Sequence, residues 1–221
     1  GPSSTSPSAS VPSADARARL IELGDAWLRT AATVTYRTVG AVDGQPTSTH
    51  QCLRQMVDTR EDIVPSLRKC SRQGELELTW DPPERWRMEV STPVEHFTLI
   101  STGARTRICP GGNPHACRPI SPALASAEAG VDILFRRPEQ FLHVIGTDEV
   151  HVSDRGVPEG IGTPVECFGA TGSNGHAEWC YTSDGVLVSL LEGAGVGDWT
   201  VLEATAVEPG VDPAVFEASA G

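Results

Sequence analysis

The sequence predicts an α+β fold in which helices cover one large antiparallel β-sheet. Apolar residues recur at alternate positions on both sides of a central helical stretch, and this period of two is typical of strands with one buried face. Glycine-rich and Asp-Gly turns separate the strands, which do not alternate with helices, so we expect an antiparallel sheet. The 221-residue chain has room for about ten strands, with helices at its start and middle. Because a large twisted sheet curls, the helices are expected on its concave side.

Length and composition favour a single domain over residues 13–221. A chain of 221 residues with 39% hydrophobic residues buries roughly 70% of the surface that it exposes when unfolded, which suffices for one sizeable core. The net charge of −12 repels phosphate backbones and anionic bilayers, so nucleic acid is not an expected partner. No stretch approaches the roughly 18 to 20 consecutive apolar residues that span a bilayer.

Residues 1–12 are expected to form a flexible tether. They are rich in Ser and Pro and carry no side-chain charge, a composition that does not pack. Gly1 and Pro2 are typical of the residues left when a protease removes a tag. A tether of small residues is what a lipid-anchored protein uses to hold its domain off a membrane, and the disordered end of a freely secreted protein is the alternative. A signal peptide and a lipid anchor would both lie outside this sequence.

A helix followed by a β-hairpin is expected after the tether. Ser13 is placed to cap a helix of about five turns over residues 13–32. Its apolar residues are three and four apart, the spacing of an amphipathic helix. Residues 33–42 then alternate, "DGQP" makes a turn, and residues 47–58 run back. The apolar residues of the helix are Ala16, Leu20, Leu23, Trp27 and Leu28.

Residues 75–109 are expected to form a meander of strands. Leu76, Leu78 and Trp80 share one face of the first strand, residues 75–80, which "DPP" ends. The following strands are expected over residues 85–92, 96–102 and 104–109.

The middle of the chain, residues 121–146, is expected to be helical in two pieces, with Pro138 in the first turn of the second. Because this stretch interrupts the strands, we expect it to act as the lid of any ligand site. Strands return for the rest of the chain, over residues 148–154, 163–170, 176–183, 186–193 and 199–208.

The six cysteines are expected to form three local disulfides. They make no Cys-x-x-Cys pair of the kind seen in zinc sites. Six cysteines allow about 15 connectivities, and proximity across turn-rich inserts favours Cys52–Cys70, Cys109–Cys117 and Cys167–Cys180. Disulfides imply an oxidising compartment, hence a secreted or cell-envelope protein. Six reduced, buried thiols in a cytosolic protein are the alternative.

Motifs for catalysis and for cofactor binding are absent from the sequence. Gly-x-Ser-x-Gly, the P-loop pattern, Gly-x-Gly-x-x-Gly and His-Glu-x-x-His do not occur. His143 and His151 flank Glu149, and they would bind a metal only if the fold brought the ring nitrogens together. We therefore expect a protein that is not an enzyme, with no catalytic residues, no metal and no cofactor.

Large apolar residues on the strand faces are the positive signal for a ligand. They would line a cavity if the helices left a gap, and they would otherwise fill an ordinary core. The candidate cavity-lining residues are Trp80, Trp86, Met88, Phe97, Leu99, Val188, Leu190 and Trp199.

Several stretches of the chain resemble the LolA-like lipoprotein carriers, especially the actinobacterial envelope lipoproteins of the LppX/LprG type. The stretches "PPERWRMEV" and "HFTLISTGARTRIC" are similar to consecutive strands of that family. "SDGVLV", at residues 183–188, is similar to a later turn and strand, and "LEATAVEPGVDPAVFE" is similar to the last strand with its acidic-aromatic tail. The resemblance covers roughly residues 33–217.

The resemblance implies a strongly curved sheet in the form of an incomplete barrel, with helices on its concave side and an apolar cavity between them. Relatives of this kind carry the acyl chains of lipids or lipoproteins through the envelope. The expected function is therefore binding or transport of an apolar ligand, an acyl chain, by an extracytoplasmic and lipid-anchored domain. The alternative is an envelope interaction or sensory module, without a lipid cavity, that binds another envelope protein.

Overall fold

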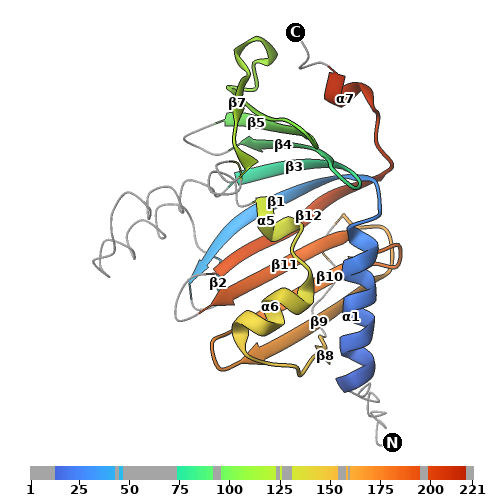
Figure 1. Ribbon diagram of the computed structural model, residues 1–221. Helices are drawn as coiled ribbons and strands as arrows, with labels where there is room; N and C mark the ends of the chain where they lie inside the picture. The colour runs from blue at the N-terminus through green and yellow to red at the C-terminus, as the bar shows by residue number, and fades with distance from the viewer. Residues whose placement is uncertain are drawn as a thin grey trace, which may run out of the picture.

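The fold is one open antiparallel sheet with helices packed mainly on one face (Figure 1). The computed structural model describes residues 13–42, 45–46, 74–91, 96–122, 125, 131–153, 158, 160–194 and 199–217. The strands are β1 (Ala32–Val42), β2 (Gln45–Pro46), β3 (Gly74–Asp81), β4 (Arg85–Ser91), β5 (His96–Thr102), β6 (Thr106–Pro110), β7 (Arg118–Ile120), β8 (His151–Val152), β9 (Val165–Gly172), β10 (Gly175–Thr182), β11 (Leu187–Ala194) and β12 (Trp199–Pro209). The helices are α1 (Ser13–Trp27), the short 3-10 helix η1 (Pro114–Ala116), α5 (Val131–Leu134), α6 (Pro138–Ile145) and α7 (Ala214–Glu217).

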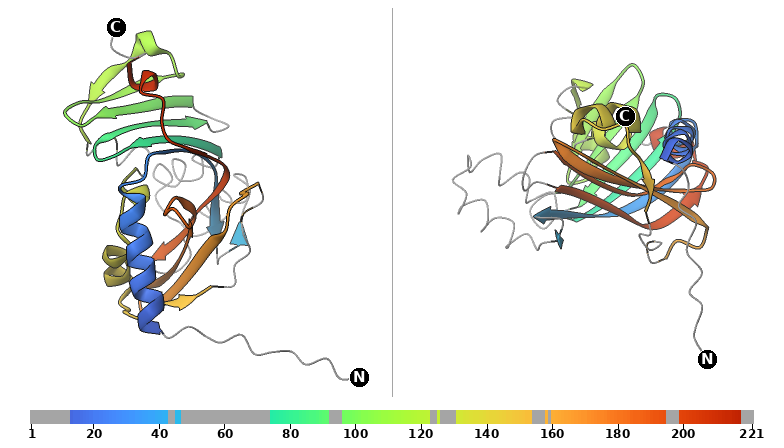
Figure 2. Two further views of the ribbon diagram at one scale, coloured as in Figure 1. Left: turned by 90° about the vertical axis from the view of Figure 1, so that its right-hand side faces the viewer. Right: turned by 90° about the horizontal axis from the view of Figure 1, so that it is seen from below.

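The strands are ordered β7-β6-β5-β4-β3-β1-β12-β11-β10-β9-β8, and β2 pairs with β1 outside this path. The long strands β1 and β12 lie at the centre and join a half made of β3–β7 to a half made of β8–β11 (Figure 1). Figure 2 shows how strongly the sheet twists and curves. The predicted class, an α+β fold with a curved antiparallel sheet that does not close, is confirmed.

The described residues form twelve strands, more than the ten or so expected. β7 has three residues and β2 has two, too few to produce a visible alternation of apolar side chains. β2 falls in the turn that we expected at "DGQP". The returning strand expected over residues 47–58 lies outside the described residues.

Alternation along the strands separates two faces of the sheet. Directly paired residues of antiparallel strands lie on the same face, so the register traces rows across the sheet. One such row runs from Val34 through Leu78 and Met88 to Leu99, and all four side chains are buried. We call this face, on which α1, α5 and α6 lie, the helix-covered face, and the opposite one the outer face.

Helix α1 is shorter than expected, with 15 residues instead of about 20, because the chain turns after Trp27, where the Arg29 N–H donates to the Ala26 carbonyl oxygen. Its buried residues include Leu20, Leu23 and Trp27, as the spacing predicts. Gly24 allows close contact with α6, since a Cβ there would lie 2.6 Å from Cδ of Pro138. Pro138 occupies the first turn of α6, as predicted. Among the described residues, no helix is long and apolar enough to cross a membrane.

The C-terminal segment returns across the outer face. The chain leaves β12 at Gly210, whose N–H donates to the Ala31 carbonyl oxygen at 2.9 Å. Phe216 of α7 then packs against Ile100 and Cys109, with the Arg85 guanidinium 5.1 Å from the centre of its ring. This separate small core fixes the end of the described chain over β4–β6, on the side away from the other helices.

Candidate functional site

Most predicted cavity-lining residues lie together on the helix-covered face. Trp80 pairs with Trp86, and Leu99 pairs with Met88. Phe97 follows in the adjacent row on the same face of β5. These five residues belong to the β3–β5 half of the sheet. Val188 and Leu190 lie in β11, on the other side of the central strands, and pack in the same hydrophobic cluster.

The side chains at the centre of this cluster are completely covered. Met88, Leu99 and Val188 have 0% exposure and Leu190 has 1%. A ligand therefore reaches them only if the helices separate from the sheet. Trp199 is paired in the register with Ala41 and Gly193, and its side chain lies outside the described part of the structure.

A group of half-buried apolar side chains borders the core at the β4–β7 end of the sheet, and we call it the apolar fringe. Phe135, just after α5, lies over two tryptophans, with ring centroids 4.6 Å from Trp80 and 6.3 Å from Trp86. The fringe consists of Trp86, Ile108, Ile120, Ile133 and Phe135.

Of the five fringe residues, only Trp86 was predicted from the sequence to line a cavity. Ile108 lies in a strand that we predicted, and it pairs directly with Leu99. Pairing these two strands in the sequence would therefore have placed Ile108 on the same face as Leu99. Ile133 and Phe135 come from the predicted helical stretch, where no period relates them to positions on the sheet. Contacts between a helix and a distant strand depend on tertiary packing, which alternation within a strand does not specify.

Two tryptophan side chains hold α5 in place. The Trp27 indole N–H donates to the Leu134 carbonyl oxygen at 2.6 Å, and the Trp80 indole N–H donates to the Trp27 carbonyl oxygen at 3.1 Å. The last turn of α5 is thus connected through the end of α1 to β3. Its remaining contacts in the fringe are apolar and half-exposed.

Helix α6 belongs to the predicted lid, residues 121–146, but it is held firmly against the sheet. The backbone N–H of Asn174 donates to the Ile145 carbonyl oxygen at 3.0 Å, so the β9–β10 turn caps the helix end. Gly172 passes so close to α6 that a Cβ there would lie 2.0 Å from the same oxygen. Within the described part of the lid, α5 and Phe135 are therefore better placed to move than α6.

The buried polar groups near α6 serve packing. The Tyr36 hydroxyl donates to the Leu187 carbonyl oxygen at 2.7 Å. Burial strongly raises the pKa of Tyr36 and of Tyr181, and the nearby Glu192 carboxylate raises the pKa of Tyr181 further. Glu192, itself buried, pairs with Arg136 at 3.3 Å. Both phenols stay protonated at neutral pH and behave as neutral core groups.

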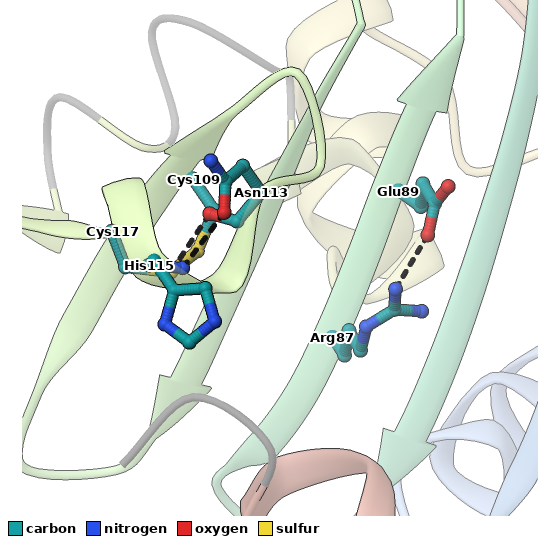
Figure 3. Close-up of a disulfide and its surroundings, with 6 residues drawn as sticks. All are labelled: Arg87, Glu89, Cys109, Asn113, His115 and Cys117. Carbon is teal, nitrogen blue, oxygen red and sulfur yellow. Dashed lines mark hydrogen bonds and ion pairs between the residues drawn. A yellow bond between two sulfur atoms is a disulfide. The ribbon is translucent and has the colours of Figure 1, made fainter. Parts of the chain in front are cut away.

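Two of the three predicted disulfides are confirmed, and both lie on the outer face or at its edge. Cys167–Cys180 joins directly paired residues of β9 and β10. Cys109–Cys117 links β6 to the segment before β7 (Figure 3). The loop that it closes is ordered by Asn113, whose side-chain oxygen accepts from the His115 backbone N–H at 3.0 Å. The predicted pair Cys52–Cys70 lies outside the described residues.

No metal-binding cluster of three or more His, Cys, Asp or Glu side chains occurs in the described ranges. His143 and His151 are both exposed. The ring of His151 lies over β9, where a Cβ on Gly169 would be 2.6 Å from its Nε2.

Comparison with known proteins gives a likeness of fold. No family model matches the chain, and no curated protein does. The structure is similar to the crystal structure of LprF from Mycobacterium bovis, with 12% sequence identity and a TM-score of 0.46, over 91% of this chain and 98% of that one. This likeness concerns the fold alone.

Proposed function

We propose that this protein is an extracytoplasmic domain that binds or carries an apolar ligand, an acyl chain, between the helix-covered face of the sheet and α5. The observation that carries the proposal is the apolar fringe. It leaves five large side chains half-buried beside a fully covered core, where a monomeric protein would gain stability by burying them. No covalent chemistry, metal or cofactor is part of the proposal.

The energetics suit a passive binder. Each methylene that moves from water into the site contributes about 0.8 kcal/mol. A chain of about a dozen carbons therefore supplies enough free energy to offset the ordering of ligand and protein. Phe135 would have to leave Trp80 so that the chain could pass from the fringe toward Leu99.

The disulfides are compatible with such an opening. Cys167–Cys180 joins two strands, and Cys109–Cys117 joins β6 to the residue between η1 and β7. Neither disulfide involves α1, α5 or α6. The sheet can therefore stay rigid while α5 moves. The resemblance to lipoprotein carriers supports the same ligand class and an envelope location with an N-terminal lipid anchor, both of which are part of this proposal.

Filling the core does not test the site cleanly. Leu99 and Leu190 are fully packed, so a tryptophan at either position would strain the core and lower stability by about 1–3 kcal/mol. A charge in the half-buried fringe is a sharper test, because it opposes an acyl chain at little cost to the free protein.

Ile133→Glu in α5 should weaken the binding of cis-parinaric acid, a fluorescent fatty acid, at least about tenfold, because the bound chain would desolvate the carboxylate. Ile120→Glu in β7 puts the same negative charge at another position of the fringe and should also weaken binding. The matched control is Val144→Glu in α6, where the side chain is already 50% exposed. Thermal unfolding would check that all three variants fold.

The proposal requires saturable uptake by the wild type and by Val144→Glu, together with a loss in the fringe variants. Equal uptake by all the proteins would contradict a site at the fringe. No uptake by any of them would contradict lipid binding and would favour the alternative, an interaction or sensory module.

A further inference from the structure

A hollow lies on the outer face, away from the apolar fringe, and we call it the outer groove. It has a volume of about 480 Å³, within the range of roughly 300–1,000 Å³ typical of small-molecule sites. Its floor is formed by β12, β1, β3 and β4, and its wall by the C-terminal segment. The residues around it are Thr33, Thr35, Glu77, Thr79, Arg87, Ala206, Glu208, Pro209, Gly210, Val211, Asp212 and Val215.

The floor consists of two neighbouring rows of directly paired residues. The first row runs from Glu208 through Thr33 and Thr79 to Arg87. In the second row Thr35 pairs with Glu77. The floor is hollow because threonine side chains are short.

Hydrogen-bond donors and acceptors are held at fixed positions in this floor. Thr79 is buried, and the Thr33 hydroxyl donates to its Oγ1 at 3.4 Å. The Arg87 guanidinium lies at one end of the first row, where it donates to the Glu77 and Glu89 carboxylates; Figure 3 shows the contact with Glu89. A hydroxyl both donates and accepts, so this floor suits a ligand that also does both.

The wall of the outer groove is largely apolar and is anchored at both ends. Gly210 is bonded to Ala31 at one end, and Phe216 is packed against Ile100 at the other. Between them, Val211 and Val215 line the groove. A ligand with a face of C–H groups would rest on these side chains.

Arg87 and Asp212 at the groove both have partners within the protein, and Glu77 and Glu208 add negative charge to its floor. Arg87 binds two carboxylates, and the Asp212 carboxylate accepts from the Ala214 backbone N–H at 2.9 Å. A bound anion would have to compete with Glu77 for the guanidinium. The groove therefore favours a neutral ligand over a phosphate or a carboxylate.

We propose that the outer groove binds a neutral polyhydroxylated ligand, a saccharide, with its hydroxyls on the threonine and Arg87 row and its C–H face on Val211 and Val215. The proposal goes beyond the proposed function and is independent of it, since the two sites lie on opposite faces of the sheet.

The test is an amide-resolved NMR titration of the whole protein with maltose, trehalose and α-1,6-mannobiose, each to tens of millimolar. The expected result is saturable shifts at Thr33, Thr79, Arg87 and Val211 with at least one of these disaccharides. In Thr33→Val/Thr79→Val these shifts should weaken by about tenfold or disappear, because both hydroxyls are lost. This double variant should still fold, since it removes both members of a hydrogen-bonded pair together.

The control is Thr98→Val, which changes a threonine on the outer face of β5, away from the groove, and should leave the titration unchanged. The proposal is overturned if none of the disaccharides shifts the groove amides, or if the shifts persist in the double valine variant. Groove shifts produced instead by spermidine or by inorganic phosphate would also overturn it, because they would assign the groove to a charged ligand.

Discussion

Thr98 illustrates how single polar atoms limit the stability of this sheet. Its side chain is 3% exposed, and its hydroxyl makes no hydrogen bond within the part of the chain that the structure describes. A buried hydroxyl without a partner costs about 1–3 kcal/mol, whereas a methyl group of the same shape does not. The buried hydroxyl of Thr106, in contrast, donates to Oγ of Ser101.

Thr98→Val should therefore raise the free energy of unfolding by about 1 kcal/mol, measured by urea titration. Thr106→Val is the matched comparison and should lower it, because it leaves Ser101 without this partner. Equal destabilisation by the two substitutions would show that the Thr98 hydroxyl does have a hydrogen-bond partner in the folded protein.

At the scale of elements, the pairing of β4 with β5 is supported by charge on the outer face. Burial acts to raise the pKa of Glu89, but hydrogen bonds from His96 and Arg87 outweigh it, so the pKa is lowered overall. A carboxyl with a lowered pKa stabilises the fold above its unfolded pKa, near 4.5. That stabilisation is lost as the pH falls through the lower folded value.

Glu89→Gln should reproduce this loss at every pH. The difference in unfolding free energy between the wild type and Glu89→Gln should be greatest near pH 6 and should shrink as the pH falls below about 4.5. Denaturant unfolding at a series of pH values measures it. A difference that does not change with pH would contradict a stabilising role for the ionised carboxylate.

The sequence was informative about elements wherever a strand was long enough to alternate. β3, β4 and β5 occur where the pattern predicts them, and Pro138 begins a helix as expected. β7 was missed because three residues do not establish a period. The position of Phe135 over Trp80 depends on how a helix packs against a distant strand, so it was visible only in the structure.

Over its described residues, the whole molecule consists of two main parts, a disulfide-linked sheet and a helical cover made of α1, α5 and α6. Both described disulfides lie in the sheet or beside it, and the cover is joined to the sheet by apolar packing and by hydrogen bonds such as that from the Trp80 indole N–H to the Trp27 carbonyl oxygen. We propose that the acyl ligand binds between the two parts, with the sheet as the rigid one.

Replacing Cys167 and Cys180 together by alanine should therefore lower stability and leave ligand binding unchanged. The two cysteines are separated by 13 residues, for which loop closure predicts a loss of about 3 kcal/mol. Urea unfolding measures this loss, and cis-parinaric acid titration at low temperature measures affinity. A large fall in affinity of the folded variant would show that this disulfide shapes the ligand site.

If the protein holds an acyl ligand between the sheet and α5, that ligand should stay bound when the protein is weighed. Native mass spectrometry tests it most directly, with the protein mixed with phospholipid vesicles, recovered and then weighed. We expect one acyl species per chain for the wild type and for Val144→Glu, and a bare chain for Ile133→Glu. A bare wild-type chain after exposure to both phospholipid vesicles and lipid extracted from the native envelope would contradict it.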